Sequence, residues 1–288
     1  MSDVIYYAPH SLTEALTYLR EHPDATPFAG GTDLLVGMEY DKVHLTRILD
    51  LKALTPELGY IREEEGVYHI GALVTVSQLA NHEGLQKKYP FLTKAASMLG
   101  SWQVRSSATV GGNICNGAPS AELTPCWLVL DAKAVIAGPE GERVLPVEQF
   151  LKGPGQVALA GGELLKEILV ERLDPRLTGG YHCRKLRRSM DVAIVNMAAS
   201  LVTDHEGTVR QAHVALGAVG PVVFRVPEAE AALVGSPLTS ETVAAAAAKC
   251  RDAARPIDDI RSSGAYRREM VEVYTREMLT HLGKGDAE

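Results

Sequence analysis

The chain reads Phe-Ala-Gly-Gly-Thr-Asp-Leu at residues 28–34 and Thr-Val-Gly-Gly-Asn-Ile-Cys-Asn at residues 109–116. In each stretch a glycine pair follows an apolar residue and precedes small polar residues. Such a pair lets the backbone turn sharply and present successive N–H groups with no side chain in the way, as a bound phosphate or pyrophosphate requires. A Gly-Gly pair is also an ordinary tight turn. The occurrence of two similar pairs favours a nucleotide cofactor.

The sequence around the two turns predicts a mixture of helices and strands. The capping box Ser11-Leu-Thr-Glu14 and the apolar spacing after it predict a helix over residues 12–20. The same reasoning predicts helices at 75–81 and 91–99, with a polar stretch between them, and strands at 25–29, 43–50 and 67–73. The segment 103–125 has no helical period and is dense in Gly, Ser, Asn and Pro. We expect a long functional loop there.

The C-terminal part of the chain has a different pattern. Asp-Pro and Gly-Gly dipeptides around residues 174–180 predict a domain boundary. Two apolar runs joined by Asp204-His-Glu-Gly207 predict a β-hairpin, and helical spacing predicts helices at 242–255 and 265–282. The expected apolar face of the last helix comprises Tyr266, Met270, Val273, Tyr274 and Met278. The predicted class is α+β, with a first domain over 1–176 and a small α+β domain over 177–288, in which helices cover a short antiparallel sheet.

Composition excludes several classes of protein. The 288 residues are 46% apolar and 23% charged, as in a folded globular chain. The net charge of −7 argues against nucleic acid or an anionic membrane as the main partner, and no apolar run approaches the ~20 residues of a membrane span. The first ten residues lack the features of a secretion signal, and the four cysteines are widely spaced. We therefore expect a cytoplasmic chain with reduced thiols and no metal site of its own.

Signatures of other nucleotide and hydrolase sites are missing from the sequence. No G-x-G-x-x-G opens a helix and no G-x-x-x-x-G-K-[ST] is present, so neither a Rossmann nor a P-loop site is supported. The motifs H-E-x-x-H and G-x-S-x-G are also missing. Hydrolase functions are therefore disfavoured.

A set of motifs recurs in the order found in one known family. The motifs are residues 29–34, 103–105, 108–116, 118–125, 185–193 and 262–268. They span nearly the whole chain and resemble the FAD-binding medium subunits of the molybdenum hydroxylases, the family of xanthine dehydrogenase and carbon monoxide dehydrogenase. The separate FAD-binding subunits of bacterial xanthine dehydrogenases look most similar, because the patterns at 112–118 and 153–155 recur there.

The resemblance implies FAD as the cofactor and a PCMH-type FAD-binding domain with subdomains at about 1–58 and 59–176. Residues of the first turn that would hold the pyrophosphate and ribityl chain are Ala29, Gly30, Gly31, Thr32, Asp33 and Leu34. Residues expected at the cofactor from the second turn are Thr109, Gly111, Gly112, Asn113, Cys115 and Asn116. Glu122 stands where the family usually has Asp, and Lys185 and Asp191 belong to the second domain. No side chain is expected to act as acid, base or nucleophile, because the flavin is the reactive group.

Several of these residues have a second interpretation. Glu122 and Asp191 are also consistent with surface or capping carboxylates, and Cys115 with a small buried apolar residue. Leu99 occupies the place of an aromatic that shields the flavin in some relatives, and Trp102 is a nearby substitute. A local basic cluster fits either a group that stabilises reduced flavin or a solvated strand edge. The basic cluster comprises Arg184, Lys185, Arg187 and Arg188.

The resemblance implies electron transfer within a larger enzyme. A molybdopterin-binding large subunit would hydroxylate the substrate, a small subunit with two [2Fe–2S] clusters would relay electrons, and FAD on this chain would pass them to NAD⁺ or another acceptor. The expected assembly is a dimer of heterotrimers. The alternatives are a medium subunit of the carbon monoxide or nicotinate dehydrogenase type, a stand-alone FAD-dependent oxidase or reductase, and an assembly protein without FAD. The two intact glycine pairs argue against the last.

Overall fold

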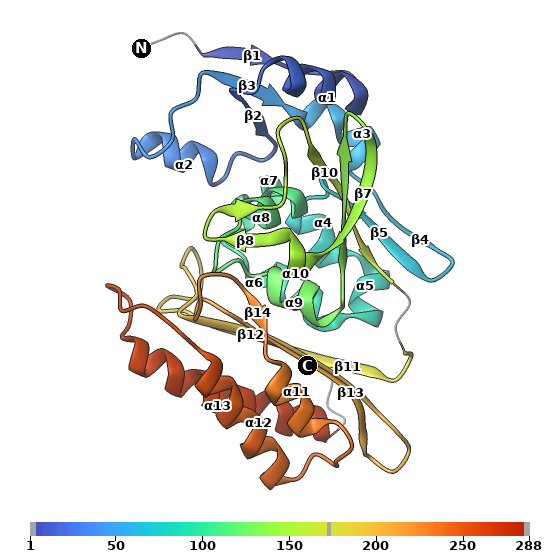
Figure 1. The fold of residues 1–288 in the computed structure, drawn as a ribbon, viewed down its shortest axis with the longest axis vertical. Helices are drawn as coiled ribbons and strands as arrows, with labels where there is room; N and C mark the ends of the chain where they lie inside the picture. Colours follow the sequence, from blue (N-terminus) through green and yellow to red (C-terminus); the bar gives the residue numbers. More distant parts are fainter. Residues whose placement is uncertain (1–3, 172–173, 285–288) are drawn as a thin grey trace.

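The structure is a computed structural model that describes residues 4–171 and 174–284. The ends of the two expected domains, residues 1–3 and 285–288, lie outside the described residues, as do residues 172–173. Figure 1 shows an N-terminal unit above a sheet with short helices, and below them a second sheet with the C-terminal helices beneath it. The α+β class is confirmed.

The N-terminal unit is a three-stranded parallel sheet in the order β1-β3-β2. Its elements are β1 (Ile5–Tyr7), α1 (Leu12–Glu21), β2 (Ala25–Phe28), α2 (Leu34–Glu39), β3 (Arg47–Asp50), a 3-10 helix (Leu51–Leu54) and α3 (Thr55–Leu58). The helix expected at 12–20 is confirmed as α1, and Ser11 Oγ accepts a hydrogen bond from the N–H of Glu14. β3 covers only the second half of the strand expected at 43–50. β1 and α2 are too short to leave a periodic pattern, so the sequence did not predict them.

The second unit is a five-stranded antiparallel sheet in the order β4-β5-β10-β6-β7, packed against short helices. The helices expected at 75–81 and 91–99 are confirmed as α4 and α6, and the polar stretch between them also folds, as α5. Its elements are β4 (Ile61–Glu64), β5 (Val67–Gly71), α4 (Val76–Asn81), α5 (Glu83–Lys88), α6 (Pro90–Met98), α7 (Trp102–Ser107), α8 (Val110–Cys115), α9 (Thr124–Val129), β6 (Lys133–Gly138), β7 (Gly141–Pro146), α10 (Val147–Phe150), β8 (Leu151–Gly153), β9 (Gln156–Val157) and β10 (Leu164–Val170).

The prediction of a long loop at residues 103–125 is wrong, because α7, α8 and the start of α9 occupy much of it. The first two helices have six residues each and begin at a capping hydroxyl. Ser101 Oγ accepts from the N–H of Val104 at 3.3 Å, and Thr109 Oγ1 accepts from the N–H of Gly112 at 3.0 Å. Helices this short depend on caps and packing rather than on intrinsic propensity. Their Gly, Ser and Asn residues are typical of loops, so the sequence pattern did not predict helices here.

The C-terminal unit is a four-stranded antiparallel sheet in the order β11-β12-β13-β14, with helices on its outer face (Figure 1). The predicted hairpin joins β12 to β13, and the helices expected at 242–255 and 265–282 are α12 and α13. Its elements are β11 (Leu177–Arg184), β12 (Val195–Thr203), β13 (Val209–Gly217), β14 (Phe224–Arg225), α11 (Pro227–Leu233), α12 (Ser240–Ala253) and α13 (Gly264–Gly283).

The glycine pair used as a boundary signal lies inside β11, so it does not form a turn. A Cβ atom on Gly179 would lie 2.4 Å from the ring of Phe91 in α6, and one on Gly180 would lie 3.0 Å from Cγ of Met278 in α13. The strand is therefore packed tightly on both faces. Glycine is needed here for space rather than for backbone freedom.

The four-stranded sheet of the C-terminal unit packs against the helices of the first domain through a shared buried core. Trp127 of α9 and Tyr181 of β11 belong to the same cluster of buried residues. Ser200 Oγ of β12 donates to the carbonyl oxygen of Val129 at the end of α9, at 2.7 Å. The sheet thus buries apolar surface and also satisfies a backbone acceptor of the other domain.

The predicted face of α13 is confirmed in part: Met278 is buried and Met270 and Tyr274 pack against the core. The buried face is rotated from the predicted one, since Tyr266 is 39% exposed while Val271 and Thr275 are fully buried. Arg267, on the buried face, is 3% exposed and donates to the carbonyl oxygens of Ile194 and Ala218. Polar residues with internal partners interrupt the apolar stripe, which shifted the predicted face. None of the helices in 4–171 and 174–284 has the length and apolarity required to cross a membrane.

Candidate functional site

A cavity of about 840 Å³ lies where the first glycine turn, the second glycine turn and the loop between β11 and β12 meet. Both domains contribute to its walls. Leu51, Leu73, Leu164 and Leu165 give it an apolar side. Its size is that of a typical small-molecule or cofactor site, in which an apolar lining carries a few placed polar groups.

The first turn (residues 29–34) lines the cavity with backbone donors. Within the described part of the chain, the N–H groups of Gly30, Gly31, Thr32, Asp33 and Leu34 have no acceptor. Gly31 has φ +67°, a conformation that glycine adopts readily and other residues do not. Consecutive N–H groups without internal partners form the kind of backbone nest that binds phosphate oxygens.

Close contacts fix the position of the first turn. A Cβ atom on Gly30 would lie 1.9 Å from the carbonyl oxygen of Ser107 at the end of α7, so this turn runs directly against the segment that leads into the second turn. A Cβ atom on Gly31 would lie 2.5 Å from the ring of Phe28. The ammonium group of Lys52 lies 4.3 Å from the centroid of the same ring. Neither glycine can take a side chain unless its neighbours move.

The second turn does not present free N–H groups, so that part of the prediction is wrong. The N–H of Gly111 donates to the carbonyl oxygen of Ala72 at 2.8 Å, and the N–H groups of Gly112 and Asn113 donate to Oγ1 and the carbonyl oxygen of Thr109. A Cβ atom on Gly111 would lie 2.8 Å from both Cβ and the carbonyl oxygen of Ala72. These glycines let α8 pack closely, and the second turn forms a wall of the cavity.

The side chain of Asn113 supplies a polar group that the protein leaves unpaired. Its Oδ1 atom is buried and has no hydrogen-bond partner among the described residues, and the residue lines the cavity. A buried acceptor without a donor costs about 1–3 kcal/mol. A ligand with anionic oxygens and a hydroxyl or N–H donor could bond to both the N–H groups of the first turn and Asn113 Oδ1. FAD carries such groups in its pyrophosphate oxygens and ribityl hydroxyls.

Lys185 does not line the cavity and is buried rather than at a solvated strand edge. Its ammonium group donates to Glu122 Oε1 at 2.8 Å and to the carbonyl oxygen of Met98 at 2.9 Å. Lys185 therefore meets the site only through Glu122. Every other residue that the resemblance placed in the site lines the cavity: Ala29, Gly30, Gly31, Thr32, Asp33, Leu34, Thr109, Gly111, Gly112, Asn113, Cys115, Asn116, Glu122 and Asp191.

Asp191 lines the cavity from the second domain. Its carboxylate accepts hydrogen bonds from the N–H of Arg187 at 2.8 Å and from its neighbour Val192 at 3.0 Å. Burial opposes ionisation, but these backbone hydrogen bonds outweigh it and hold the pKa of Asp191 below its ordinary value. The carboxylate is therefore ionised and fixed in place by its own loop.

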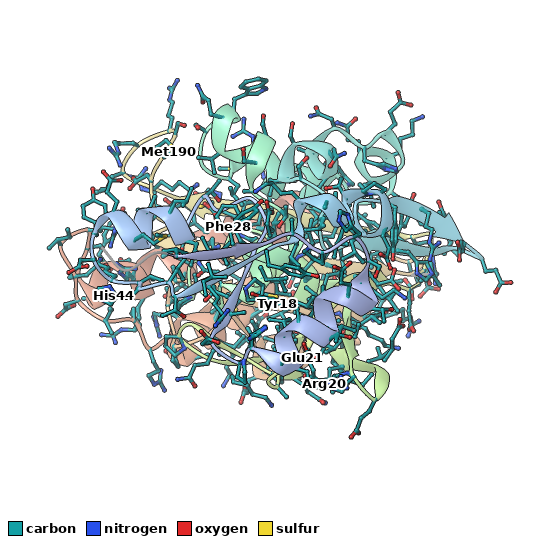
Figure 2. All side chains as sticks on the ribbon, turned by 90° about the horizontal axis from the view of Figure 1, so that it is seen from above. Tyr18, Arg20, Glu21, Phe28, His44 and Met190 are labelled. Carbon is teal, nitrogen blue, oxygen red and sulfur yellow. The ribbon has the colours of Figure 1, made fainter. Side chains whose placement is uncertain are left out.

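The loop between β11 and β12 also supplies lining residues that sequence reasoning missed. Met190 and Val192 line the cavity, with 55% and 41% of their surface exposed. Met190 has φ +50°, its N–H donates to the carbonyl oxygen of Gly100 at 3.3 Å, and Ser189 Oγ donates to the same oxygen at 2.9 Å. Figure 2 shows Met190 on this loop near the edge of the molecule, with Phe28 further in. The only sequence signal was the position of Met190 within the 185–193 motif.

The described lining of the cavity contains carboxylates but few other groups that commonly act in acid–base catalysis. Among the described residues that line it there is no histidine, and Phe28 is the only aromatic residue. Leu99 lines the cavity, whereas the nearby aromatic Trp102 does not. Burial raises the pKa of Cys115 to about 12, which keeps the thiol neutral. The arrangement is suited to holding a cofactor.

Comparison with known proteins agrees with this geometry. Residues 2–171 match the family model described as the FAD binding domain in molybdopterin dehydrogenase, and residues 181–282 match the CO dehydrogenase flavoprotein C-terminal domain. The chain is 31% identical to the nicotinate dehydrogenase FAD-subunit of Eubacterium barkeri, over 98% of this chain and 97% of that one. It is 30% identical to the xanthine dehydrogenase FAD-binding subunit of Escherichia coli O157:H7, over 96% and 94%. A carbon monoxide dehydrogenase structure from Hydrogenophaga pseudoflava superposes with a TM-score of 0.92 at 31% identity, covering 96% of each chain.

Proposed function

This chain belongs to the FAD-binding medium subunits of the molybdenum hydroxylases, and on that premise we propose that it transfers electrons from [2Fe–2S] clusters of a partner subunit to NAD⁺ or another acceptor. Its cofactor is FAD and it is a subunit of an oxidoreductase. Bound FAD supplies the ability to accept electrons singly and to deliver two of them as a hydride. The protein supplies position and electrostatics.

The proposal rests on one observation: the same cavity holds unpaired hydrogen-bond donors and an unpaired hydrogen-bond acceptor. The first turn offers unpaired N–H donors to anionic oxygens, and Asn113 Oδ1 opposite offers an unpaired acceptor to a hydroxyl or N–H group. A dinucleotide with a sugar-alcohol chain carries both complements.

An exposed apolar rim around the cavity supports a role as a subunit. Large exposed apolar side chains gather around the cavity, each lining it or lying within two residues of a lining residue. They are Leu35 (51% exposed), Val36 (47%), Trp102 (69%), Leu186 (61%), Met190 (55%), Val192 (41%) and Ile260 (99%). Exposed apolar groups gathered around a functional opening are typical of an interaction site. We infer that the small subunit covers this rim.

The remaining features follow from the family rather than from this chain. Printed names of relatives describe them as subunits or medium chains of dehydrogenases that act on different substrates, including nicotinate, xanthine and carbon monoxide. We infer that the partner large subunit holds the molybdopterin and selects the substrate, that the assembly is a dimer of heterotrimers, and that it works in the cytoplasm. The four free cysteines are consistent with a reducing compartment.

The experiment that tests the proposal is a spectrum of the purified full chain, followed by release and chromatographic identification of any bound flavin. We expect intact FAD, and we expect anaerobic NADH to bleach its absorption if NAD⁺ is the acceptor. Bleaching by a reduced [2Fe–2S] protein but not by NADH would support electron transfer to a different acceptor. A colourless chain that does not take up added FAD would contradict the proposal.

A further inference from the structure

Glu122 and Lys185 form a buried ion pair that touches the cavity on one side only. The distance from Lys185 Nζ to Glu122 Oε1 is 2.8 Å, and the two side chains are 5% and 13% exposed, respectively. Glu122 lines the cavity, whereas Lys185 lies behind it and also donates to the carbonyl oxygen of Met98, the last residue of α6. The three groups come from three separate elements.

Neither charge has another ionic partner among the described residues. Glu122 accepts its one hydrogen bond from Lys185, and the ammonium group has only the Met98 carbonyl besides. A buried charge that loses its partner is strongly destabilised, so removal of either side chain would leave the other as an uncompensated buried charge. One oxygen of the Glu122 carboxylate also keeps free acceptor capacity beside the cavity.

The polarity of the cavity indicates which part of the cofactor meets this pair. The N–H donors of the first turn attract the two negative charges of a pyrophosphate, whereas Glu122 and Asp191 repel them. Asp191 already accepts two backbone hydrogen bonds, and Asp33 belongs to the first turn itself, so Glu122 is the lining carboxylate outside that turn with capacity to spare. The uncharged part of the ligand therefore lies beside Glu122.

Resting on the proposed function, we propose that Glu122 and Lys185 act as one neutral couple that sets the reduction potential of the bound flavin. Two-electron reduction with uptake of one proton from solvent leaves one negative charge on the flavin. An uncompensated Lys185 charge would favour the reduced form, and an uncompensated Glu122 charge would oppose it. Glu122 is the group that faces the cofactor, and Lys185 is a positioning residue that acts through it.

The test is a reductive titration of the FAD-loaded full chain against a reference dye, together with the dissociation constant of oxidised FAD. Glu122→Gln keeps an oxygen acceptor for Lys185 but removes the negative charge. We expect its affinity for reduced relative to oxidised FAD to rise by about tenfold, which raises the potential of a two-electron couple by about 30 mV. Lys185→Met should lower the potential, and the double variant should lie closer to wild type than either single variant.

Glu230→Gln is the matched control, because Glu230 is paired with Arg225 at 2.8 Å, has a side chain 11% exposed, and does not line the cavity. This variant should leave the potential unchanged. If Glu122→Gln binds FAD and keeps the wild-type potential, the inference is overturned while the proposed function stands. If the wild-type chain binds no FAD, the proposed function itself has failed. If Lys185→Met does not fold, Glu122→Gln and the double variant still decide the question.

Discussion

The first glycine turn leaves its N–H groups without acceptors, whereas the second turn uses the N–H groups of Gly111, Gly112 and Asn113 to build α8. The first turn is partly exposed and leads into α2, which has no buried residue. The second turn packs into the protein on one side, where α8 buries Val110, Gly111 and Ile114, while Gly112 stays exposed. Both turns line the same cavity, and the first turn packs near Gly30 against Ser107 and Ala108, which lead into the second.

The difference teaches that one dipeptide serves two physical purposes. In the first turn glycine gives backbone freedom, which φ +67° at Gly31 requires, and the donors remain available to a ligand. In the second turn glycine gives proximity, since Ala72 leaves no room for a side chain on Gly111. Substitutions in the first turn should therefore affect ligand binding, and substitutions in the second should affect folding.

Gly111→Val should have the largest effect. Its branched side chain would meet Ala72 within a packed core, and overpacking of this kind costs roughly 3 kcal/mol. We expect the free energy of unfolding in urea to fall by about that amount in the FAD-free chain. Gly161→Val is the control, because a Cβ atom there meets nothing within 4 Å. Equal stability of the Gly111 variant and wild type would refute a packing role for the second turn.

Gly31→Ala should act mainly on binding. Alanine at φ +67° is strained, and its Cβ atom would meet the ring of Phe28, so the turn must shift and misalign its donors. We expect FAD affinity to fall by about tenfold, or about 1.4 kcal/mol, measured by flavin fluorescence titration. Gly207→Ala, at φ +79° with nothing within 4 Å, carries a similar backbone cost away from the cavity. It should lose stability but keep wild-type affinity, and a loss of affinity in both variants would count against the prediction.

Thr109→Ala should have a smaller effect on stability. It removes the hydroxyl that accepts from the N–H of Gly112 and caps α8, which costs about 1 kcal/mol. The midpoint of urea unfolding should decrease accordingly, and Thr109→Ser should retain most of the wild-type value. An alanine variant as stable as wild type would show that the cap does not contribute.

The smallest effect is expected for alkylation of the Cys115 thiol, which should hardly react in the folded chain. With the pKa raised to about 12, only about one thiol in ten thousand is ionised at pH 8. Alkylation by iodoacetamide, followed by mass spectrometry, should be slow in the folded chain and fast in urea. Thr32→Cys would place a thiol of similar exposure beside the free N–H groups of the first turn, which favour a thiolate, and should react much faster. Rapid labelling of Cys115 in the folded chain would contradict the closed second turn.

The elements that the sequence could predict are those with a periodic or capped pattern. The box at Ser11 and Glu14 locates α1, and the Asp204 to Gly207 turn locates the hairpin of β12 and β13, because the relevant contacts are local in sequence. The sequence did not predict α7 and α8, because each has six residues and depends on contacts with distant segments. The packing role of Gly179 likewise depends on Phe91, far away in the chain.

The candidate site divides in the same way. The glycine motifs and Asp191 could be placed from sequence because the motifs name them, and all of them line the cavity. Whether a glycine N–H is free or bonded could not be predicted, since the acceptor for Gly111 is Ala72 in another segment. The position of Lys185 behind Glu122 also depends on how two domains pack. The sequence could therefore predict which residues line the cavity, but not which groups they form hydrogen bonds with.

The core shared by Trp127 and Tyr181 has a consequence for how such chains can be recombined. The two family models meet between residues 171 and 181, yet the buried cluster continues across that junction. A chimera that joins the first part of this chain to the second part of a relative 30% identical to it would combine halves of two different cores. The two segments are separate in sequence classification but share one buried core, so exchange of one segment should require compensating changes in the other.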